Sequence, residues 1–324
     1  MSVPNAAALA ERLRRQSGLQ GKHDIRAVAA VFRHDPFPAL GTAAAIGDDA
    51  ALLPPVAGSP LLACEALQPS LVEEDPWFAG WSAVLVNVSD IAAMGGRPVA
   101  VVNSLWSCGG GHAEPLLAGM RAACDTFDVP MVGGHINQQS PYNALAVAIL
   151  GEAPGPVLST RAAKEGDELW LLVNPAGRFH RHYPFWDAAT GADPAQLRSH
   201  LALLPQLART RAVRAAKDIS MGGLAGTAVM FAEGARLGLE IELHRIPRPP
   251  GVDELPWLTC FPSFGFLLAV DPARSGDLVA AITPHADLRG CRIGAFHGPD
   301  HGVVLNREGD RARLWAPDQR FTGF

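Results

Sequence analysis

Apolar residues follow two spacings along the chain, one typical of strands and one typical of helices. Between residues 41 and 153, short apolar runs of strand length alternate with two stretches of helical periodicity. The helical stretches cover residues 76–94 and 112–127, and the strand-like runs are TAAAI, AALL, PLLAC, VAVVNSL, VPMVG and ALAVAIL. This alternation predicts an α/β or α+β domain.

The same alternation begins again after the Pro- and Gly-rich segment EAPGPVLS. It runs from the strand-like DELWLLV through predicted helices near 194–216 and 223–236 to the runs FGFLLAV, RIGAFHG and GVVLN. Residues 5–34 instead alternate apolar and basic positions around a glycine-containing break, which favours a leading arm. We therefore expect three parts, and these are an arm at 1–40, a first domain at 41–153 and a second domain at 154–324.

Composition and charge narrow the class of protein and of ligand. The 324 residues are 48% hydrophobic, which suffices for one large core or two medium ones. The formal net charge is −5 without any block of like charge, which argues against nucleic acid or a membrane as partner and favours a small molecule. The sequence shows no secretory pattern and no apolar run long enough to span a membrane, so we expect a cytoplasmic location.

The cysteines are five in number, far apart and never in a C-x-x-C pair. This pattern predicts reduced core thiols and not a disulfide or zinc framework. One of them could be a nucleophile, but no local feature selects which.

Carboxylates stand out in two places where the surrounding sequence is apolar. Asp48 and Asp49 lie side by side in AIGDDAALLPP, where a solvated turn, a helix cap and a cation site compete as explanations. In the predicted 76–94 helix, Asn87 and Asp90 share a face away from the apolar stripe. A solvent-facing Asp90 is the simplest explanation, but the helix carries almost no other charge. A magnesium ion shared with the acidic pair would supply Asp90 with a partner.

The segment KDISMGGLAG combines an acidic residue with a pair of glycines at a predicted helix start. Gly222 and Gly223 allow an anion to approach the backbone N–H groups closely. An N-cap by Ser220 is the alternative, but it does not account for Asp218 or for the glycines.

A second glycine pair follows the strand-like run VPMVG. Gly133, Gly134 and His135 are predicted to form a turn at the strand end, and Asn137 and Gln138 follow. Their polar side chains could hydrogen-bond a nucleotide or substrate, although the bare pattern is weak.

The long segment NPAGRFHRHYPFWDAATGADP is too aromatic and irregular for a simple connector. Its cationic and ring side chains would suit an anionic or amide-bearing small molecule. The candidate acceptor-binding residues are Arg178, His180, Arg181 and His182, beside Tyr183. A surface loop with chance histidines is the alternative.

Four segments together resemble the aminoimidazole ribonucleotide (AIR) synthase superfamily. They are GDDAALL, NVSDIAAMGGRPVAVVN, VGGHINQQSPYNALAVAILGE and DISMGGLAGTAVMFAEGARLG, in the order and approximate spacing of that superfamily. The resemblance implies a two-domain PurM-like fold, in which an N-terminal mixed-sheet domain dimerises and a C-terminal α/β domain follows. It also implies ATP and Mg²⁺ as cofactors, and transfer of a phosphoryl group from ATP to an oxygen or other nucleophile.

The superfamily's motifs, matched residue by residue, imply roles for the acidic and glycine-rich segments. The implied magnesium ligands are Asp48, Asp49, Glu65, Asp90 and Asp218, and the catalytic residues among them are Asp48, Asp90 and Asp218. The nucleotide-binding set, taken together with the glycine turns above, is Lys22, Gly47, Asn87, Gly133, Gly134, His135, Asn137, Ser220, Gly222 and Gly223. Lys22 would fold over the phosphates from the arm, and a surface lysine is the alternative.

Departures from the superfamily's patterns separate its subfamilies. The chain has no cysteine before Cys64, whereas selenophosphate synthetase carries a reactive Cys or selenocysteine in the arm. His135 and Met221 stand where thiamine-monophosphate kinase usually has Asp. The segments KDISMGGL, FPSFGFLLAV and PFWDAATG are instead similar to the AIR synthase-related proteins.

This resemblance favours an ATP- and Mg²⁺-dependent phosphoryl-transfer enzyme that acts on a small-molecule acceptor, often to activate an amide or similar carbonyl. It also implies a homodimer. A small-molecule kinase like thiamine-monophosphate kinase and a non-catalytic ATP-binding assembly subunit are the alternatives.

Overall fold

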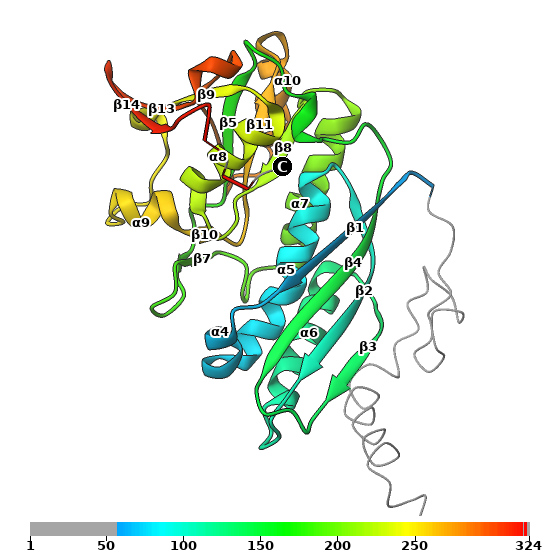
Figure 1. The fold of residues 1–324 in the computed structure, drawn as a ribbon. Coiled ribbons are helices and arrows are strands. Elements are labelled where there is room, and N and C mark those ends of the chain that lie inside the picture. Colours follow the sequence, from blue (N-terminus) through cyan, green and yellow to red (C-terminus); the bar gives the residue numbers. More distant parts are fainter. Residues whose placement is uncertain (1–56, 320, 323–324) are drawn as a thin grey trace, which may run out of the picture. The chain divides into compact units, whose positions relative to one another are not determined.

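The computed structural model describes residues 57–319 and 321–322, which form two compact units (Figure 1). The first unit contains Leu62–Asn87 and Val99–Leu150. The second contains residues 57–61, Val88–Pro98 and the chain from Gly151 onward. The predicted arm and the runs TAAAI and AALL lie outside the described residues.

A four-stranded sheet with strand order β1-β4-β2-β3 forms the basis of the first unit. Its strands are β1 (Ser59–Ala66), β2 (Arg97–Trp106), β3 (Met131–Asn137) and β4 (Ala144–Ala153). The predicted runs PLLAC, VAVVNSL, VPMVG and ALAVAIL correspond to these four strands in order, so the strand predictions are confirmed here.

Helices cover one face of this sheet (Figure 1). They are α4 (Pro69–Glu74), α5 (Pro76–Ala93) and α6 (Ala113–Phe127). The predicted helices 76–94 and 112–127 are therefore confirmed, and the predicted apolar stripe of α5 is buried at Phe78, Trp81, Leu85, Val88 and Ile91. The strands alternate accordingly, since Val101 and Leu105 of β2 are buried, whereas Val102 between them is exposed.

The second unit contains a seven-stranded mixed sheet with strand order β14-β13-β9-β12-β5-β11-β8. The strands are β5 (Glu168–Val173), β8 (Ala215–Asp218), β9 (Gly238–Glu242), β11 (Gly265–Val270), β12 (Arg289–His297), β13 (Val303–Arg307) and β14 (Asp310–Trp315). Only the β13–β9 pair among the strand pairs described for this sheet is parallel.

Both faces of the central strands of this sheet are buried. Leu171 of β5 and Leu267 of β11 pack in one core with helix α8 (Gly223–Ala235). Their neighbours in sequence, such as Leu172 and Leu268, pack in a second core with α7 (Pro194–Arg209) and α10 (Ser275–Ile282). This explains why LWLLV, within DELWLLV, and FGFLLAV are continuous apolar runs.

The predicted helix 194–216 is too long by several residues. Helix α7 ends at Arg209, and Arg211 has a positive φ of 57°. Ala215 and Ala216 then belong to strand β8, which pairs antiparallel with β11. The alanines favour a helix locally, but pairing with a distant strand determines their conformation.

The aromatic segment 174–194 contains two short strands that the sequence did not predict. They are β6 (Arg178–Phe179) and β7 (Phe185–Asp187), and β7 pairs in parallel with β10 (Phe261–Pro262). The smaller elements of the second unit are α9 (Glu254–Thr259), η3 (Thr160–Ala162), η4 (Leu243–Arg245), η5 (Pro272–Arg274) and η6 (Pro299–His301).

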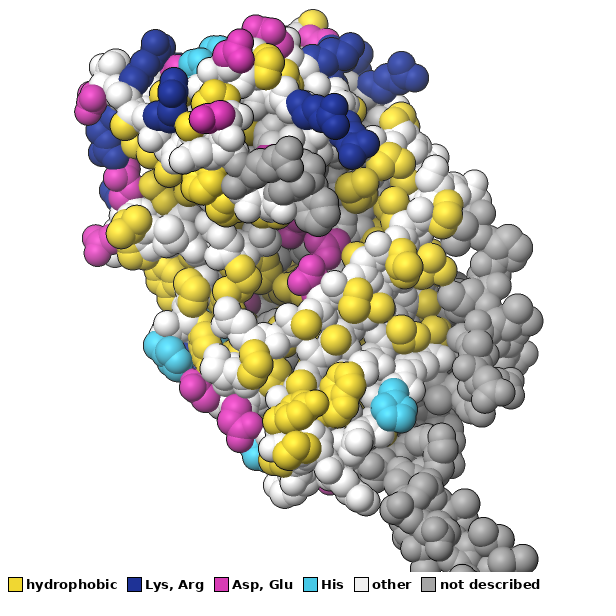
Figure 2. Space-filling model, viewed as in Figure 1, with side chains coloured by type: hydrophobic (Ala, Val, Ile, Leu, Met, Phe, Trp, Pro, Cys, Tyr) yellow, Lys and Arg dark blue, Asp and Glu magenta, His cyan; other side chains and the backbone are white. Residues whose placement is uncertain are grey.

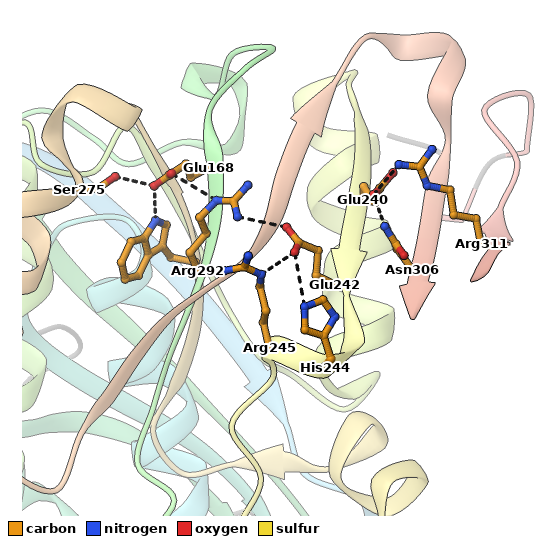
Figure 3. A network of polar contacts seen from close by, with 10 residues as sticks. Glu168, Glu240, Glu242, His244, Arg245, Ser275, Arg292, Asn306 and Arg311 are labelled. Carbon is orange, nitrogen blue, oxygen red and sulfur yellow. Dashed lines mark hydrogen bonds and ion pairs between the residues drawn. The ribbon is translucent and has the colours of Figure 1, made fainter. Parts of the chain in front are cut away.

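Ion pairs and hydrogen bonds connect strands of the second sheet (Figure 3). Arg292 of β12 lies between two carboxylates, with its Nε 3.2 Å from Glu168 Oε1 and its Nη1 3.1 Å from Glu242 Oε1. Glu242 also pairs with Arg245. This network connects β5, β12 and β9 on one face of the sheet.

All five cysteines are free, but the prediction of reduced core thiols holds for only part of them, because Cys64 and Cys108 are exposed. Burial raises the pKa of the Cys260 thiol to about 12, and burial likewise raises the pKa of Cys124. A thiol with a raised pKa is a poor nucleophile at neutral pH. None of the described helices combines the length and apolar character that a membrane span requires.

Candidate functional site

The GGH segment lies inside strand β3 and not in a turn, which corrects the sequence prediction. β3 continues to Asn137 because it pairs in parallel with β2, where Ser104 lies opposite His135 and Trp106 lies opposite Asn137. Glycines and polar residues interrupt the apolar pattern after VPMV, so the pattern alone ends the strand too early.

Gly134 makes room for a buried amide that the sequence reasoning missed. Its φ is 149°, and a Cβ atom there would lie 1.8 Å from Asn103 Oδ1. Asn103 is buried on β2, and its Oδ1 has no hydrogen-bond partner among the described residues. A Cβ atom on Gly133 would meet only ordinary contacts, at 3.6 Å from Val102. The polar Asn103 within the apolar run VAVVNSL was the available indication.

The polar face predicted for α5 is shielded from solvent. Asn87 is completely buried, and its Nδ2 donates a hydrogen bond to the Ala83 carbonyl oxygen at 2.8 Å. Its Oδ1 has no hydrogen-bond partner in the described part of the chain. Asp90, one turn further along, is half-buried. A buried oxygen without a donor is a position where a cation or a ligand N–H would be stabilising.

Asp218 is a buried carboxylate at the end of strand β8, opposite Phe266 of β11. Burial raises the pKa of its carboxyl group, although the charge of Lys217 opposes this increase. The Lys217 Nζ is 3.9 Å from Asp218 Oδ1, too far for a strong hydrogen bond. This carboxylate is therefore only weakly compensated by the protein's own cation.

The turn after Asp218 differs from the simple N-cap considered for Ser220. Helix α8 begins at Gly223 with Gly222 as its N-cap residue, and the Ser220 carbonyl oxygen accepts a hydrogen bond from the Gly223 N–H at 2.8 Å. Gly223 has a φ of 64°, and a Cβ atom on it would lie 2.4 Å from the Thr259 Cα. Glycine at 223 is thus required by packing against α9, whereas Gly222 is exposed.

The cationic segment of the second unit consists of Arg178, the first residue of β6, and the loop that connects β6 and β7. Arg178, Arg181 and His182 are exposed, and His180 is half-buried. The His182 ring stacks on the buried Tyr183 at a centroid distance of 4.3 Å. The loop therefore presents charged side chains above an ordered aromatic base.

The remaining predicted site residues are Glu65 and four residues of the N-terminal segment. Glu65 is exposed on β1. Lys22, Gly47, Asp48 and Asp49 lie outside the described residues. Within residues 57–319 and 321–322, the one group of three Asp, Glu, His or Cys side chains with ligand atoms within 4.8 Å of one another is Glu240, His297 and His301. The sequence reasoning did not select this group.

The fold and the positions of these residues define the class of protein. The chain is an α/β protein with mixed sheets that places buried carboxylate and amide oxygens near glycine-rich segments. The chain belongs to the AIR synthase related protein family, because residues 47–153 match the model of its N-terminal domain and residues 164–305 match the model of its C-terminal domain. The predicted family and PurM-like fold class are thereby confirmed.

Two relatives illustrate the range of the family. The chain is 50% identical over 286 residues to the uncharacterized protein sll0787 of Synechocystis sp., covering 88% of each chain. It is 28% identical over 313 residues to the thiamine-monophosphate kinase of Synechococcus elongatus, covering 86% of this chain and 91% of the kinase.

Solved structures with less than 25% identity show the same fold. The hydrogenase maturation protein HypE in complex with ATP matches with a TM-score of 0.68 and 19% identity, covering 95% of this chain and 98% of HypE. PurL of T. maritima complexed with ATP matches with a TM-score of 0.66 and 16% identity over 81% of this chain. The chain spans 45% of the PurL chain's length.

Proposed function

We propose that this chain is an ATP- and Mg²⁺-dependent phosphoryl-transfer enzyme that acts on a small-molecule acceptor. The proposal includes a cytoplasmic location and a division into an arm (1–40), an N-terminal domain (41–153) and a C-terminal domain (154–324). Support comes from the family and from a relative that is named a kinase. Within the described part of the structure, the main support is the carboxylate of Asp218, which is buried with only Lys217 as a distant cation. A turn with two glycines follows it in the chain.

The donor atoms at these positions fit magnesium. Burying an ionised carboxylate is costly unless a cation or several hydrogen bonds compensate it, and Lys217 at 3.9 Å compensates Asp218 only in part. Asp218 and Asp90 offer hard oxygen atoms, which Mg²⁺ prefers. They would hold the ion together with Glu65, Asp48 and Asp49, and bound Mg²⁺ would neutralise phosphate charge that repels an attacking oxygen.

The turn after Asp218 is suited to the phosphates of the nucleotide. The first N–H groups of a helix have no partner within the helix and attract anions. Gly222 is exposed at the start of the 13-residue helix α8, so no side chain blocks approach there. We assign phosphate binding to this turn, with Ser220 beside it, and nucleotide contacts to Asn87, Gly133, Gly134, His135, Asn137 and Lys22.

We assign the acceptor to the β6–β7 loop. The exposed Arg178, Arg181 and His182 would bind an anionic or amide-bearing molecule through charged hydrogen bonds. The buried Tyr183 below them holds the loop in place.

A kinase acting on thiamine monophosphate is the second candidate. The 28% identity to such a kinase, over 91% of the kinase's length, favours it. The exposed His135 and Met221 stand where that kinase usually has acidic residues, and this difference favours another acceptor.

A homodimer formed through the first unit is part of the proposal. None of the described helices lies on one face of its sheet, and Figure 2 shows hydrophobic side chains distributed over this region. Leu62 is 80% exposed and Val102 is 39% exposed on that face. An exposed apolar surface of this kind is typical of an interface, and a second copy of the chain is the proposed partner.

Binding of Mg²⁺ and ATP to Asp218→Asn tests the metal assignment. We expect at least about tenfold weaker binding of MgATP by calorimetry, because the neutral amide attracts the metal less strongly. The variant without nucleotide should be at least as stable as the parent, since it no longer buries a charge. Asp277→Asn, at an exposed residue, is the matched control and should bind MgATP normally.

An acceptor screen that measures ATP consumption tests catalysis itself. Turnover with one acceptor supports the enzyme, and binding of MgATP without turnover for any acceptor supports a non-catalytic assembly subunit. If the parent protein does not bind MgATP, both the enzyme and the non-catalytic ATP-binding subunit are contradicted.

A further inference from the structure

Three side chains of metal-ligating type meet where β9 and β12, two interior strands of the second unit's sheet, lie side by side. Glu240 belongs to β9, His297 is the last residue of β12, and His301 is the last residue of the short helix η6. Their ligand atoms all lie within 4.8 Å of one another. None of these residues belongs to the proposed MgATP site.

The sheet and a tight turn bring these residues together. His297 lies opposite Gly238 and Ala295 lies opposite Glu240, so His297 and Glu240 project from the same face. The chain then turns through η6 and returns His301 against β9. A Cβ atom on Gly238 would lie 2.5 Å from the His301 Cβ, so glycine at 238 permits this approach.

The two imidazole rings lie directly beside each other. Their centroids are 4.2 Å apart with an interplanar angle of 19°, so one ring must rotate before the in-plane lone pairs of both rings reach the same ion. The His301 Nε2 atom is buried and has no hydrogen-bond partner among the described residues. It lies 3.7 Å from Glu240 Oε2, beyond hydrogen-bond distance.

The carboxylate of Glu240 is held in position by its other oxygen. Its Oε1 accepts hydrogen bonds from Asn306 Nδ2 at 2.7 Å and from Arg311 Nη2 at 3.2 Å (Figure 3). The other oxygen, Oε2, is the one that lies beside His301. Such outer partners typically orient metal ligands.

We propose that Glu240, His297 and His301 bind a divalent transition-metal ion, and that zinc fits best. Two imidazole nitrogens and one carboxylate oxygen form a common three-ligand zinc set that leaves a fourth position open. Ligand atoms of a tetrahedral zinc site lie about 3.3 Å apart, so the 3.7 Å separation requires only a small adjustment. Magnesium fits poorly because it prefers oxygen ligands.

The bound ion would connect β9, β12 and η6. Arg311 donates a hydrogen bond to Glu240, and its positive charge opposes the binding of any cation, which favours a metal that binds imidazole strongly. The ion would hold these three elements together, with water or another ligand in its fourth position. The inference does not depend on the proposed phosphoryl transfer.

Metal analysis of the full chain tests this inference. The protein is treated with a chelator, dialysed and titrated with Zn²⁺, and bound zinc is measured by mass spectrometry. We expect one equivalent per chain, and Co²⁺ in its place should give the visible absorption of a tetrahedral site. His301→Ala should bind zinc at least about tenfold more weakly than the parent protein. If His301→Ala fails to fold, His297→Gln replaces it in the same measurement. His244→Ala, a histidine outside the group, is the control and should bind normally.

Thermal unfolding and nucleotide binding separate the possible outcomes. Zn²⁺ should raise the Tm of the parent protein and of His244→Ala but not that of His301→Ala. Asn306→Ala should weaken zinc binding about tenfold by releasing Glu240. MgATP binding should be unchanged in all these variants, so failure here is distinguishable from failure of the proposed function. Less than half an equivalent of zinc on the parent, or unchanged binding by both His301→Ala and His297→Gln, would overturn the inference.

Discussion

The carboxylate of Glu152 connects the end of β4 to the segment before β1 and to the start of β2. It lies near the end of β4, where its carboxylate accepts hydrogen bonds from the Ala57 N–H at 2.7 Å and from Arg97 Nε at 2.6 Å. Burial acts to raise the pKa of Glu152, but the hydrogen bonds and the charge of Arg97 bring it below the usual value. The charged form is therefore the form that stabilises the fold.

The pH dependence of stability should reveal this residue. Because the folded pKa is below the unfolded value of 4.5, the contribution is complete above that value and is lost as the pH falls through the folded pKa. Glu152→Gln should lower the free energy of unfolding at pH 7 by about 1–3 kcal/mol, and the difference from the parent should shrink toward pH 3. Urea unfolding across this pH range measures it, with the exposed Glu308→Gln as control. A difference that does not change with pH would contradict the role of the charge.

Single residues of the candidate site were predicted where their chemistry conflicts with their surroundings. An acidic residue in an otherwise uncharged helix indicated a shielded face, and Asn87 is indeed completely buried there. Asn103 was missed because its position became meaningful only when Gly134 was placed against it. His297 and His301 were missed because a turn and the missing side chain of Gly238 bring them to Glu240.

At the scale of elements, packing of α8 on the second sheet depends on aromatic contacts. Phe231 of α8 is completely buried and lies edge-on to Phe296 of β12, with ring centroids 5.1 Å apart. Phe231→Ala should lower the free energy of unfolding by about 3–5 kcal/mol, because it removes buried area and leaves a cavity. Val279→Ala on α10, where the side chain is 49% exposed, should cost less than about 1 kcal/mol.

Denaturant unfolding monitored by circular dichroism compares the two variants. A loss below about 1 kcal/mol for Phe231→Ala would mean that α8 does not depend on this contact.

Elements were predictable where local pattern and burial agree. Strand β11 is apolar at every position and β5 is apolar after Glu168, because both faces are covered there, so the length and composition of these runs identified them. Strand β8 was absorbed into a helix because AAKD has no alternation and only pairing with β11 makes it a strand. Strands β6 and β7 were missed for a similar reason, since β7 pairs with residues far along the chain.

At the scale of the whole molecule, the open face of the first sheet leads to a prediction about assembly. Leu62 and Val102 expose large apolar side chains there, and burying such area between two chains would be favourable. We expect the parent protein to sediment at twice its chain mass of 34.2 kDa. The double variant Leu62→Asp, Val102→Asp should shift toward the monomer, because a dimer would bury its new carboxylates.

A matched control separates this interface from apolar surface in general. Leu255 on α9 is 72% exposed in the second unit, so Leu255→Asp removes a comparable side chain without touching the first sheet. This variant should remain dimeric in the same sedimentation experiment. Dissociation of Leu255→Asp together with an intact Leu62→Asp, Val102→Asp dimer would move the interface to the second unit. A monomeric parent protein would exclude the dimer, and MgATP binding by that monomer would then show that one chain suffices for the nucleotide site.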